Sequence, residues 1–246
     1  MPVNAEQLAT PPVDKKRSAA GKPRLGVTIR RAVESDLADT VLIFWSAFSP
    51  FYPFDSTEPL SQRACHTIRL RRAVHRQKKA LDNPGYLILV AEEEQTKEIV
   101  GWAGYIKPEA CRLSHPWIAE DETLKTDEDR EAWEGVDRKV HNGLWKGCDE
   151  YRWKVLGADL DHWVLAPLAV KPSAQGQGVG TALLQHVNSL VDTDNTPAGP
   201  SPIYLDASKA GQQLYLKMGY EFYGDRARDF PGMIRWGKCK MPRPEE

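Results

Sequence analysis

The sequence predicts an α/β fold, of the α+β kind, in which a mixed central sheet is flanked by helices. Strand-like and helix-like hydrophobic patterns alternate along the chain, which favours a sheet covered by helices. Residues 161–170 are apolar at odd and even positions alike after the first two, as in a central strand buried on both faces. The 246 residues, 41% of them hydrophobic, provide enough chain for a core.

The composition argues against several classes of protein. A formal net charge of -1 gives no field that would attract nucleic acid or a membrane surface. No run approaches the roughly 18 apolar residues of a membrane-spanning helix, and the polar N-terminus lacks a secretory signal. The four cysteines are scattered, without a CxxC or paired histidine spacing, so we expect no metal site and no disulfide framework. We therefore expect reduced thiols in a cytoplasmic protein, a nuclear protein being the alternative.

Residues 1–24 form a segment of unusual composition. They hold four prolines, the basic cluster Lys15-Lys16-Arg17 and few large apolar side chains. Such a segment cannot bury enough apolar surface to fold, so we expect a disordered tail. The cluster is interpreted as part of a solvated tail, with a nuclear address as the alternative. Residues 25–246 are expected to form a single domain.

The first elements of that domain follow from local patterns. Residues 27–30 resemble a strand, and Ser35 is a candidate cap for the helix that follows. That helix repeats apolar side chains at helical spacing, namely Leu37, Val41, Phe44 and Phe48. Residues 49–54 then break the helix with two prolines and hold three aromatics, which suit either a packed loop or a wall of a ligand pocket.

Residues 61–82 predict a strongly basic helix. The stretch carries seven Lys or Arg and a single acid, and its apolar stripe is weak. A solvated face is the expected role of these charges, and an acidic partner is the alternative.

A hairpin and a long insertion come next. Residues 86–91 and 99–105 are expected to be strands joined by a charged turn. Residues 107–157 form a long polar insertion, in which Thr126 and Asp129 resemble a variant capping box. A helical stripe is expected to follow, made of Trp133, Val136, Val140 and Leu144. Residues 120–134 carry eight acids against two bases, which we expect to face solvent.

The C-terminal part predicts two further strand–helix pairs and a closing strand. Pro167 lies within the central strand, and because proline cannot donate to the ladder it indicates a bulge. A helix is expected over residues 179–191, and a short strand over 203–205. Ser208 is a candidate cap for a last helix that ends at Gly219, and a closing strand is expected around residues 234–236.

A glycine loop connects the central strand to the helix after it. The loop reads Gln175-Gly176-Gln177-Gly178-Val179-Gly180, and its glycines let the backbone approach a ligand closely. The helix behind it presents the positive end of its dipole, so an anionic group such as a pyrophosphate is expected there. The loop lacks the lysine of a Walker A motif, and Thr181 stands where a Rossmann fingerprint needs Gly or Ala.

The loop matches (Gln/Arg)-x-x-Gly-x-(Gly/Ala) and thereby resembles the pyrophosphate signature of the GNAT superfamily of acyl-CoA N-acyltransferases. Leu168-Ala169-Val170-Lys171-Pro172, just before it, resembles the end of the family's strand and the proline that follows. Leu214-Tyr215-Leu216-Lys217-Met218-Gly219-Tyr220 resembles the family's LYxKxGF. The resemblance covers about residues 27–106 and 158–240, and leaves out the tail and the insertion.

The resemblance implies a sheet that splays between its fourth and fifth strands, with acetyl-CoA bound in the gap. The strand backbone would hold the pantetheine arm, and the N–H groups of the loop would hold the pyrophosphate. The cofactor-binding residues implied are Leu168, Ala169, Val170, Gln175, Gly176, Gln177, Gly178, Val179, Gly180 and Thr181.

The resemblance also implies that Tyr215 lies near the sulfur and protonates the departing thiolate. A phenol with a pKa of about 10 can supply that proton at neutral pH. A core aromatic is the alternative role for Tyr215. The group that takes the proton from the acceptor amine stays open among Asp159, Asp161, His162, acids of the insertion and water.

The function expected is transfer of acetyl from acetyl-CoA to a primary amine of a small molecule, by direct attack in a ternary complex. A non-catalytic acyl-CoA-binding module and a protein lysine or N-terminal acetyltransferase are the alternatives. A nucleic-acid binder that uses the basic helix is disfavoured by the net charge. The sequence leaves the oligomeric state open, a homodimer included.

Overall fold

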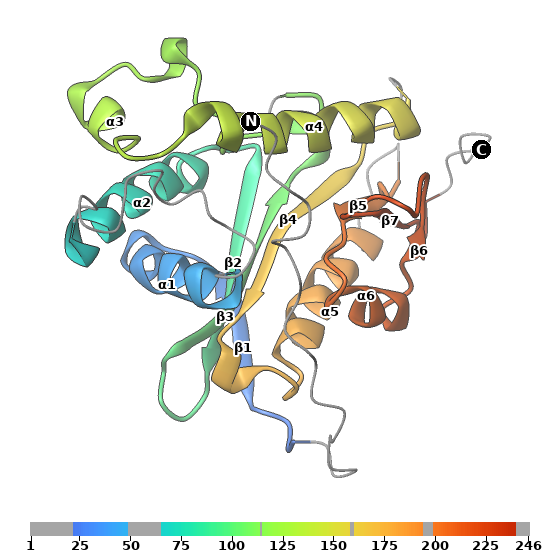
Figure 1. Cartoon of the computed structure of the whole chain (residues 1–246). Helices are drawn as coiled ribbons and strands as arrows, with labels where there is room; N and C mark the ends of the chain where they lie inside the picture. Colours follow the sequence, from blue (N-terminus) through green and yellow to red (C-terminus); the bar gives the residue numbers. More distant parts are fainter. Residues whose placement is uncertain (1–21, 49–64, 114, 158–159, 194–198, 240–246) are drawn as a thin grey trace.

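Seven strands form one sheet in the order β1-β2-β3-β4-β5-β7-β6 in the computed structural model, which describes residues 22–48, 65–113, 115–157, 160–193 and 199–239. The strands are β1 (Val27–Arg31), β2 (Tyr86–Glu93), β3 (Ile99–Ile106), β4 (Trp163–Val170), β5 (Ile203–Asp206), β6 (Glu221–Phe222) and β7 (Gly232–Arg235). Neighbours pair antiparallel except β4 and β5, which are parallel. The mixed α/β sheet predicted from the sequence is confirmed (Figure 1).

Helices cover both faces of this sheet. The helices are α1 (Leu37–Phe48), α2 (His66–Leu81), α3 (Asp127–Glu131), α4 (Arg138–Leu156), α5 (Val179–Asp192) and α6 (Gln212–Lys217). Short 3-10 turns are η2 (Glu34–Asp36), η4 (Pro108–Ala110), η5 (Asp121–Thr123) and η6 (Pro172–Ala174).

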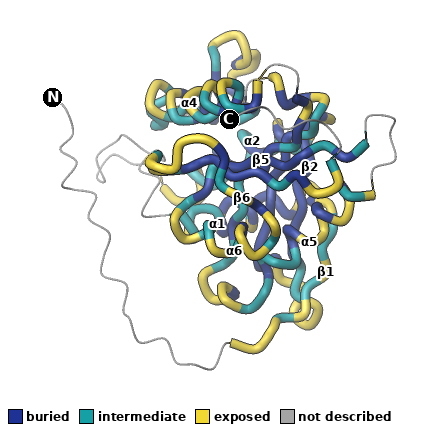
Figure 2. Tube along the Cα trace, turned by 90° about the vertical axis from the view of Figure 1, so that its right-hand side faces the viewer, coloured by how far each residue is buried: buried dark blue, intermediate teal, exposed yellow. Residues whose placement is uncertain are grey.

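Two apolar clusters lie on opposite faces, because alternate residues of a strand point to opposite sides. One cluster, here called the α5 face, joins Leu87 and Leu89 of β2 to α5 and α6. The other, here called the α4 face, joins Ile88 and Val90 to α1, α2 and the end of α4. The strands between the two clusters are buried, and the outer faces of the helices are exposed (Figure 2).

Pro167 forms the bulge that its position predicted. Ala103 pairs with Leu168 and Tyr105 with Leu165, so Ala166 and Pro167 together lie opposite the single residue Gly104. The carbonyl oxygen of Ala166 would lie 2.8 Å from a Cβ at position 104, which explains the glycine there.

Some helix boundaries differ from those expected. The stripe from Trp133 to Leu144 is not one helix, since α3 ends at Glu131, Gly135 takes a positive φ of 75°, and α4 starts at Arg138. The capping box of Thr126 and Asp129 is confirmed.

The two serines expected to cap helices do not do so. Asp36 accepts the backbone N–H of Val33 before α1, in place of Ser35. The N-cap of α6 is Gly211, in place of Ser208. In both regions a short turn precedes the helix and moves its start away from the serine.

The basic helix and the acidic insertion bind each other. Arg71 pairs with Glu131 and Arg72 with Glu134, which joins α2 to the end of α3 and the turn after it. Asp129 also lies 2.7 Å from Lys79 Nζ and 2.9 Å from His75 Nε2. The acidic partner named as the alternative for the basic helix is therefore a segment of this chain, while most acids of residues 120–134 are exposed as expected.

These pairs lead to a prediction about stability. We expect Arg71→Glu with Arg72→Glu to lower the free energy of unfolding by about 1–2 kcal/mol, since exposed pairs contribute about 0.2–1 kcal/mol each and reversal adds repulsion. Adding Glu131→Arg and Glu134→Arg should recover most of that loss in urea titrations. If the two double variants destabilise additively, the pairs contribute nothing to the docking of the insertion.

Candidate active site

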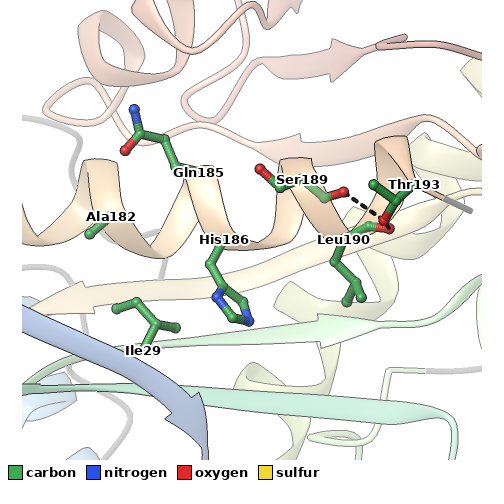
Figure 3. A pocket seen from close by; sticks show the side chains of 7 residues that line it. All are labelled: Ile29, Ala182, Gln185, His186, Ser189, Leu190 and Thr193. Carbon is green, nitrogen blue, oxygen red and sulfur yellow. Dashed lines mark hydrogen bonds between the residues drawn. The ribbon is translucent and has the colours of Figure 1, made fainter.

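A hollow between α5 and the edge strand β1 is not where reactive groups meet. It is lined by α5 and by Ile29 of β1 (Figure 3). His186 is the titratable side chain of this lining, and no acid lies beside it among the lining residues. The glycine loop and Tyr215, both singled out from the sequence, lie elsewhere, around a gap in the sheet.

The gap opens between β4 and β5. The two strands pair only from Trp163 to Leu165, opposite residues 203–205 of β5. Beyond that point β4 continues to Val170 with β3 alone beside it, whereas β5 ends at Asp206. The bulge at Pro167 begins where pairing with β5 stops, so the second half of β4 presents an open edge (Figure 1).

The backbone groups on this edge follow from the hydrogen-bond pattern. Lys171 N donates to Val100 O over 2.9 Å, and antiparallel pairs alternate in direction. The backbone N–H and C=O of Ala169 therefore also face β3. The backbone groups of Leu168 and Val170 point the other way, into the gap. Gln175 Nε2 donates to Val170 O over 3.0 Å from that side. An extended chain with amide groups can bind here as an additional strand would.

The glycine loop lies at the wide end of the gap. Gly176 and Gly178 have φ of 77° and 90°, a region that favours glycine, and no side chain caps α5, which begins at Val179. The first N–H groups of α5 are thus available to an anion. A Cβ at Gly180 would lie 3.0 Å from Leu214 of α6, so loop, gap and α6 meet at this point.

Two basic side chains accompany the loop, from a segment that the sequence placed in the tail. Lys22 Nζ donates to Gln175 O over 3.3 Å, and Leu25 N donates to Gln177 O over 3.0 Å. The Arg24 side chain lies 3.7 Å from where a Cβ of Gly178 would stand. The segment before β1 therefore crosses the loop and adds positive charge to it.

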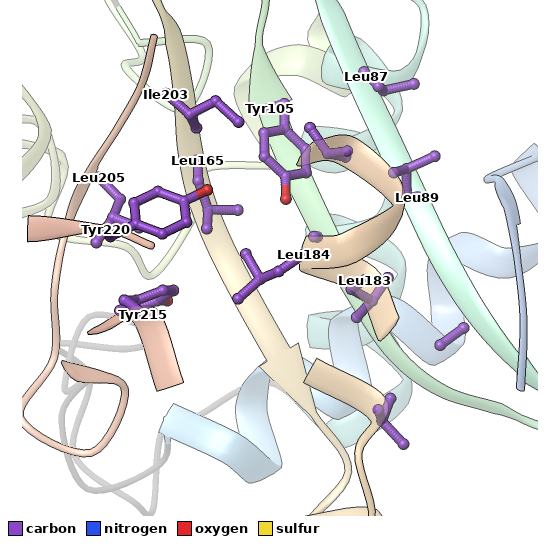
Figure 4. Close-up of a cluster of buried hydrophobic side chains, with 14 of the residues drawn as sticks. Leu87, Leu89, Tyr105, Leu165, Leu183, Leu184, Ile203, Leu205, Tyr215 and Tyr220 are labelled. Carbon is purple, nitrogen blue, oxygen red and sulfur yellow. The ribbon is translucent and has the colours of Figure 1, made fainter. Parts of the chain in front are cut away.

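Tyr215 lies on α6, on the α5 face of the gap. Its side chain packs in the cluster that holds Leu165 and Leu205, and its ring centroid is 5.7 Å from that of Tyr220 (Figure 4). Burial raises the pKa of Tyr215. The phenol therefore stays neutral across the physiological range and can act as a hydrogen-bond donor.

The candidate proton acceptors of the central strand lie away from the gap. His162 is 1% exposed, its Nδ1 bonds to Leu160 O over 2.7 Å, and burial lowers its pKa to about 4. The Asp161 side chain is 62% exposed and pairs with Arg112 over 3.2 Å. Both precede β4, at the end opposite to the gap. Asp159 and residues 49–54 lie outside the described residues.

A carboxylate that sequence reasoning missed lies where the gap begins. Asp206 follows the last β4–β5 pair, and its Oδ1 accepts from Arg228 Nη1 over 2.9 Å and from the Tyr204 hydroxyl over 3.3 Å. The Arg228 guanidinium lies 3.6 Å from the ring centroid of Tyr151 on α4. Burial raises the pKa of Asp206. The only signal in the sequence was one acid at the end of a short apolar strand.

Neither a metal-ligand cluster nor a membrane-spanning helix occurs in the described residues. No group of three or more His, Cys, Asp or Glu side chains there is arranged to hold a metal ion. In the same ranges, no helix is both long and apolar enough to cross a membrane.

Comparisons with known proteins give a matching family model and a solved structure of similar fold. A family model described as an acetyltransferase (GNAT) domain matches residues 84–222. A crystal structure of histone acetyltransferase HPA2 and related acetyltransferase from Corynebacterium glutamicum is 21% identical, with a TM-score of 0.51 over 88% of this chain and 98% of that one. No curated protein matches the sequence significantly.

Two further structures are similar with lower scores. An N-acetyltransferase from Staphylococcus aureus is 17% identical over 84% of this chain and 99% of that one, with a TM-score of 0.49. A GNAT family acetyltransferase from Brucella melitensis, in complex with acetyl-CoA, is 17% identical over 90% and 95%, with a TM-score of 0.42.

Proposed function

Since the chain belongs to the GNAT acetyltransferase family, whose model matches more than half of it, we propose that it transfers acetyl from acetyl-CoA to a primary amine of a small molecule. The amine attacks the thioester directly in a ternary complex. Within the described residues the cysteines are free, and burial raises the pKa of Cys111 and Cys148, which makes both poor nucleophiles for a covalent relay.

The observation that carries this proposal is the open edge of β4 with the glycine loop at its end. Leu168 and Val170 offer backbone groups to the amides of an extended pantetheine arm. The loop at residues 175–181 offers N–H groups to the pyrophosphate. A pantetheine arm that runs from this loop along the open edge of β4 brings its thioester to the narrow end of the gap, beside Leu165.

Tyr215 is the proposed acid of the reaction. Sulfur gains negative charge as the tetrahedral intermediate collapses, and a neutral phenol beside it stabilises that charge by donating a hydrogen bond. The raised pKa of Tyr215 makes hydrogen bonding more important than complete proton transfer.

A small acceptor is favoured because the insertion covers the α4 face. Tyr151 of α4 contacts Arg228 and its hydroxyl accepts from Asp225 N over 2.5 Å, so α4 is tied to the loop before β7. Helix α4 and this loop thus form a wall, which restricts the approach of a folded protein more than the approach of a free amine.

The function is tested by incubating the protein with acetyl-CoA and either primary amines or lysine peptides, and by reading the thiol released. We expect thiol release with amines. Release with peptides alone would identify a protein acetyltransferase, and cofactor binding without any release would identify a non-catalytic module.

The basic segment before β1 allows a prediction about cofactor affinity. We expect Lys22→Ala with Arg24→Ala to weaken acetyl-CoA binding about tenfold, or about 1.4 kcal/mol, because two cations near the phosphates are lost. Isothermal titration calorimetry at two salt concentrations measures this, and the difference should shrink at high salt. Lys125→Ala with Lys139→Ala removes the same charge from the insertion and should change nothing. Equal affinities of both double variants would contradict the prediction.

A further inference from the structure

The proposed reaction needs a proton acceptor near the narrow end of the gap. An amine arrives at neutral pH largely as an ammonium ion, which has no lone pair for attack. His162 and Asp161 lie beyond the paired part of β4, at the end away from the gap. Asp206 instead lies one residue after Leu205, the last residue of β5 that pairs with β4.

The alternation of β5 directs Asp206 to the face that suits an incoming amine. Ile203 and Leu205 belong to the cluster on the α5 face, which also holds Tyr215. Tyr204 belongs to the cluster on the α4 face, so Asp206, two residues later, points the same way. A thioester in the gap would therefore have Tyr215 on one side and Asp206 on the other.

The contacts of Asp206 leave one of its oxygens available. Arg228 and Tyr204 both bond to Oδ1, and among the described residues these are the two hydrogen bonds to its carboxylate. The Asp206 side chain is 15% exposed, so it is largely shielded from water without being sealed. Arg228 lies against Tyr151 and fixes the orientation of the carboxylate.

We propose that Asp206 binds the acceptor ammonium through Oδ2 and takes its proton, and that Arg228 positions Asp206 for this step. The inference rests on the proposed function and names its acceptor class, a primary amine that arrives as a cation. Burial, which raises the pKa of Asp206, makes the carboxylate a better base than an exposed one.

The step balances as follows. One proton passes from the ammonium to Asp206 and on to water, and the freed lone pair forms the C–N bond at the thioester carbon. The C–S bond then breaks and sulfur leaves with its electron pair. The nitrogen loses its second proton, sulfur gains one, and one proton is released overall.

The test compares Asp206→Asn with the parent on benzylamine, ethylamine and 2,2,2-trifluoroethylamine. We expect kcat/KM to fall by about 10²-fold or more for the first two, because the variant cannot accept a proton. The loss should be much smaller for trifluoroethylamine, since its fluorines lower the pKa of the ammonium and much of it is already the free amine. Acetyl-CoA affinity should be unchanged.

A matched control separates this role from a general effect of charge. Asp161→Asn removes an exposed carboxylate at the other end of the strand and should keep the parent's rates. A loss in Asp206→Asn that is equal for all three amines would overturn the role as proton acceptor, as would unchanged rates.

If that variant does not fold, Asp206→Glu serves, with an expected loss of about tenfold and the same dependence on the amine. Arg228→Gln should lower kcat/KM and raise the pKa of the acidic limb in its pH profile, because Arg228 lowers the pKa of Asp206. An unchanged profile and rate would remove Arg228 from the proposal.

A parent protein that acetylates none of the amines would overturn the proposed function together with this assignment. A parent that acetylates them equally well with Asn at position 206 would overturn the assignment alone.

Discussion

Gly178→Asp is expected to weaken acetyl-CoA binding by about 10²-fold, or about 2.7 kcal/mol, while the protein stays folded. Gly178 is the N-cap of α5, and aspartate is a favourable N-cap residue, so the helix itself should persist. The new carboxylate would accept the N–H groups that the pyrophosphate needs, and its charge would repel the phosphates. Titration calorimetry on the folded variant measures the effect.

A second glycine controls for backbone strain. Gly178 has a φ of 90°, so any side chain there is strained whatever binds nearby. Gly199 has a φ of 73° with open space around it, in the connection between α5 and β5 at the other end of the helix. Gly199→Asp should lower thermal stability similarly and leave acetyl-CoA affinity intact. Equal affinity in Gly178→Asp would show that the loop does not hold the cofactor.

The sequence was most informative where the structure is local. The central strand, the glycine loop and α5 follow one another along the chain, so their patterns could be read together. The bulge at Pro167 could be predicted because a proline, which has no N–H, cannot donate a ladder hydrogen bond in any sheet. The gap between the fourth and fifth strands was predicted from the family resemblance, whereas the parallel pairing of β4 and β5 was seen only in the structure.

The insertion was hard to predict because α4 buries polar side chains. Asn142 bonds to the backbone of Ala119 in both directions, at 2.8 and 3.0 Å, and Asp149 accepts from His115 N over 2.8 Å. Arg152 is buried against Asp149 at 2.8 Å. A hydrophobic stripe cannot reveal such a helix, and the apolar residues that suggested a stripe fall partly in a turn.

Asp206, Arg228 and Tyr151 could not have been grouped from the sequence. They come from the end of β5, the connection before β7 and α4, and only the folded chain brings them together. β5 and the connection before β7 supply the first two, whereas the insertion, which the family resemblance does not cover, supplies the third. The family resemblance could therefore predict the gap, but it could not predict Asp206 as the proposed proton acceptor.

Tyr215 belongs to the α5 face, on the other side of the gap from Asp206. We expect Tyr215→Phe to lower the rate constant for acetyl transfer by at least about tenfold, which is about 1.4 kcal/mol of barrier. The variant keeps the ring and its packing against Leu165 and Leu205, so acetyl-CoA affinity and stability should barely change. What it loses is the hydroxyl proposed to donate to the departing sulfur. Single-turnover acetylation, beside a binding titration, separates these two effects.

The raised pKa of Tyr215 adds a condition on pH. Because burial keeps the phenol protonated above its ordinary pKa of about 10, Tyr215 should cause no fall in rate between about pH 8 and 10. Tyr220→Phe is the matched control, since Tyr220 lies beside Tyr215 and bonds to Asn188 over 3.3 Å, on the side of α5. Removing its hydroxyl should affect stability more than rate. If both variants transfer acetyl at the parent's rate with chemistry limiting, the thiolate leaves without help from either phenol, and water or a backbone N–H of the gap must stabilise it.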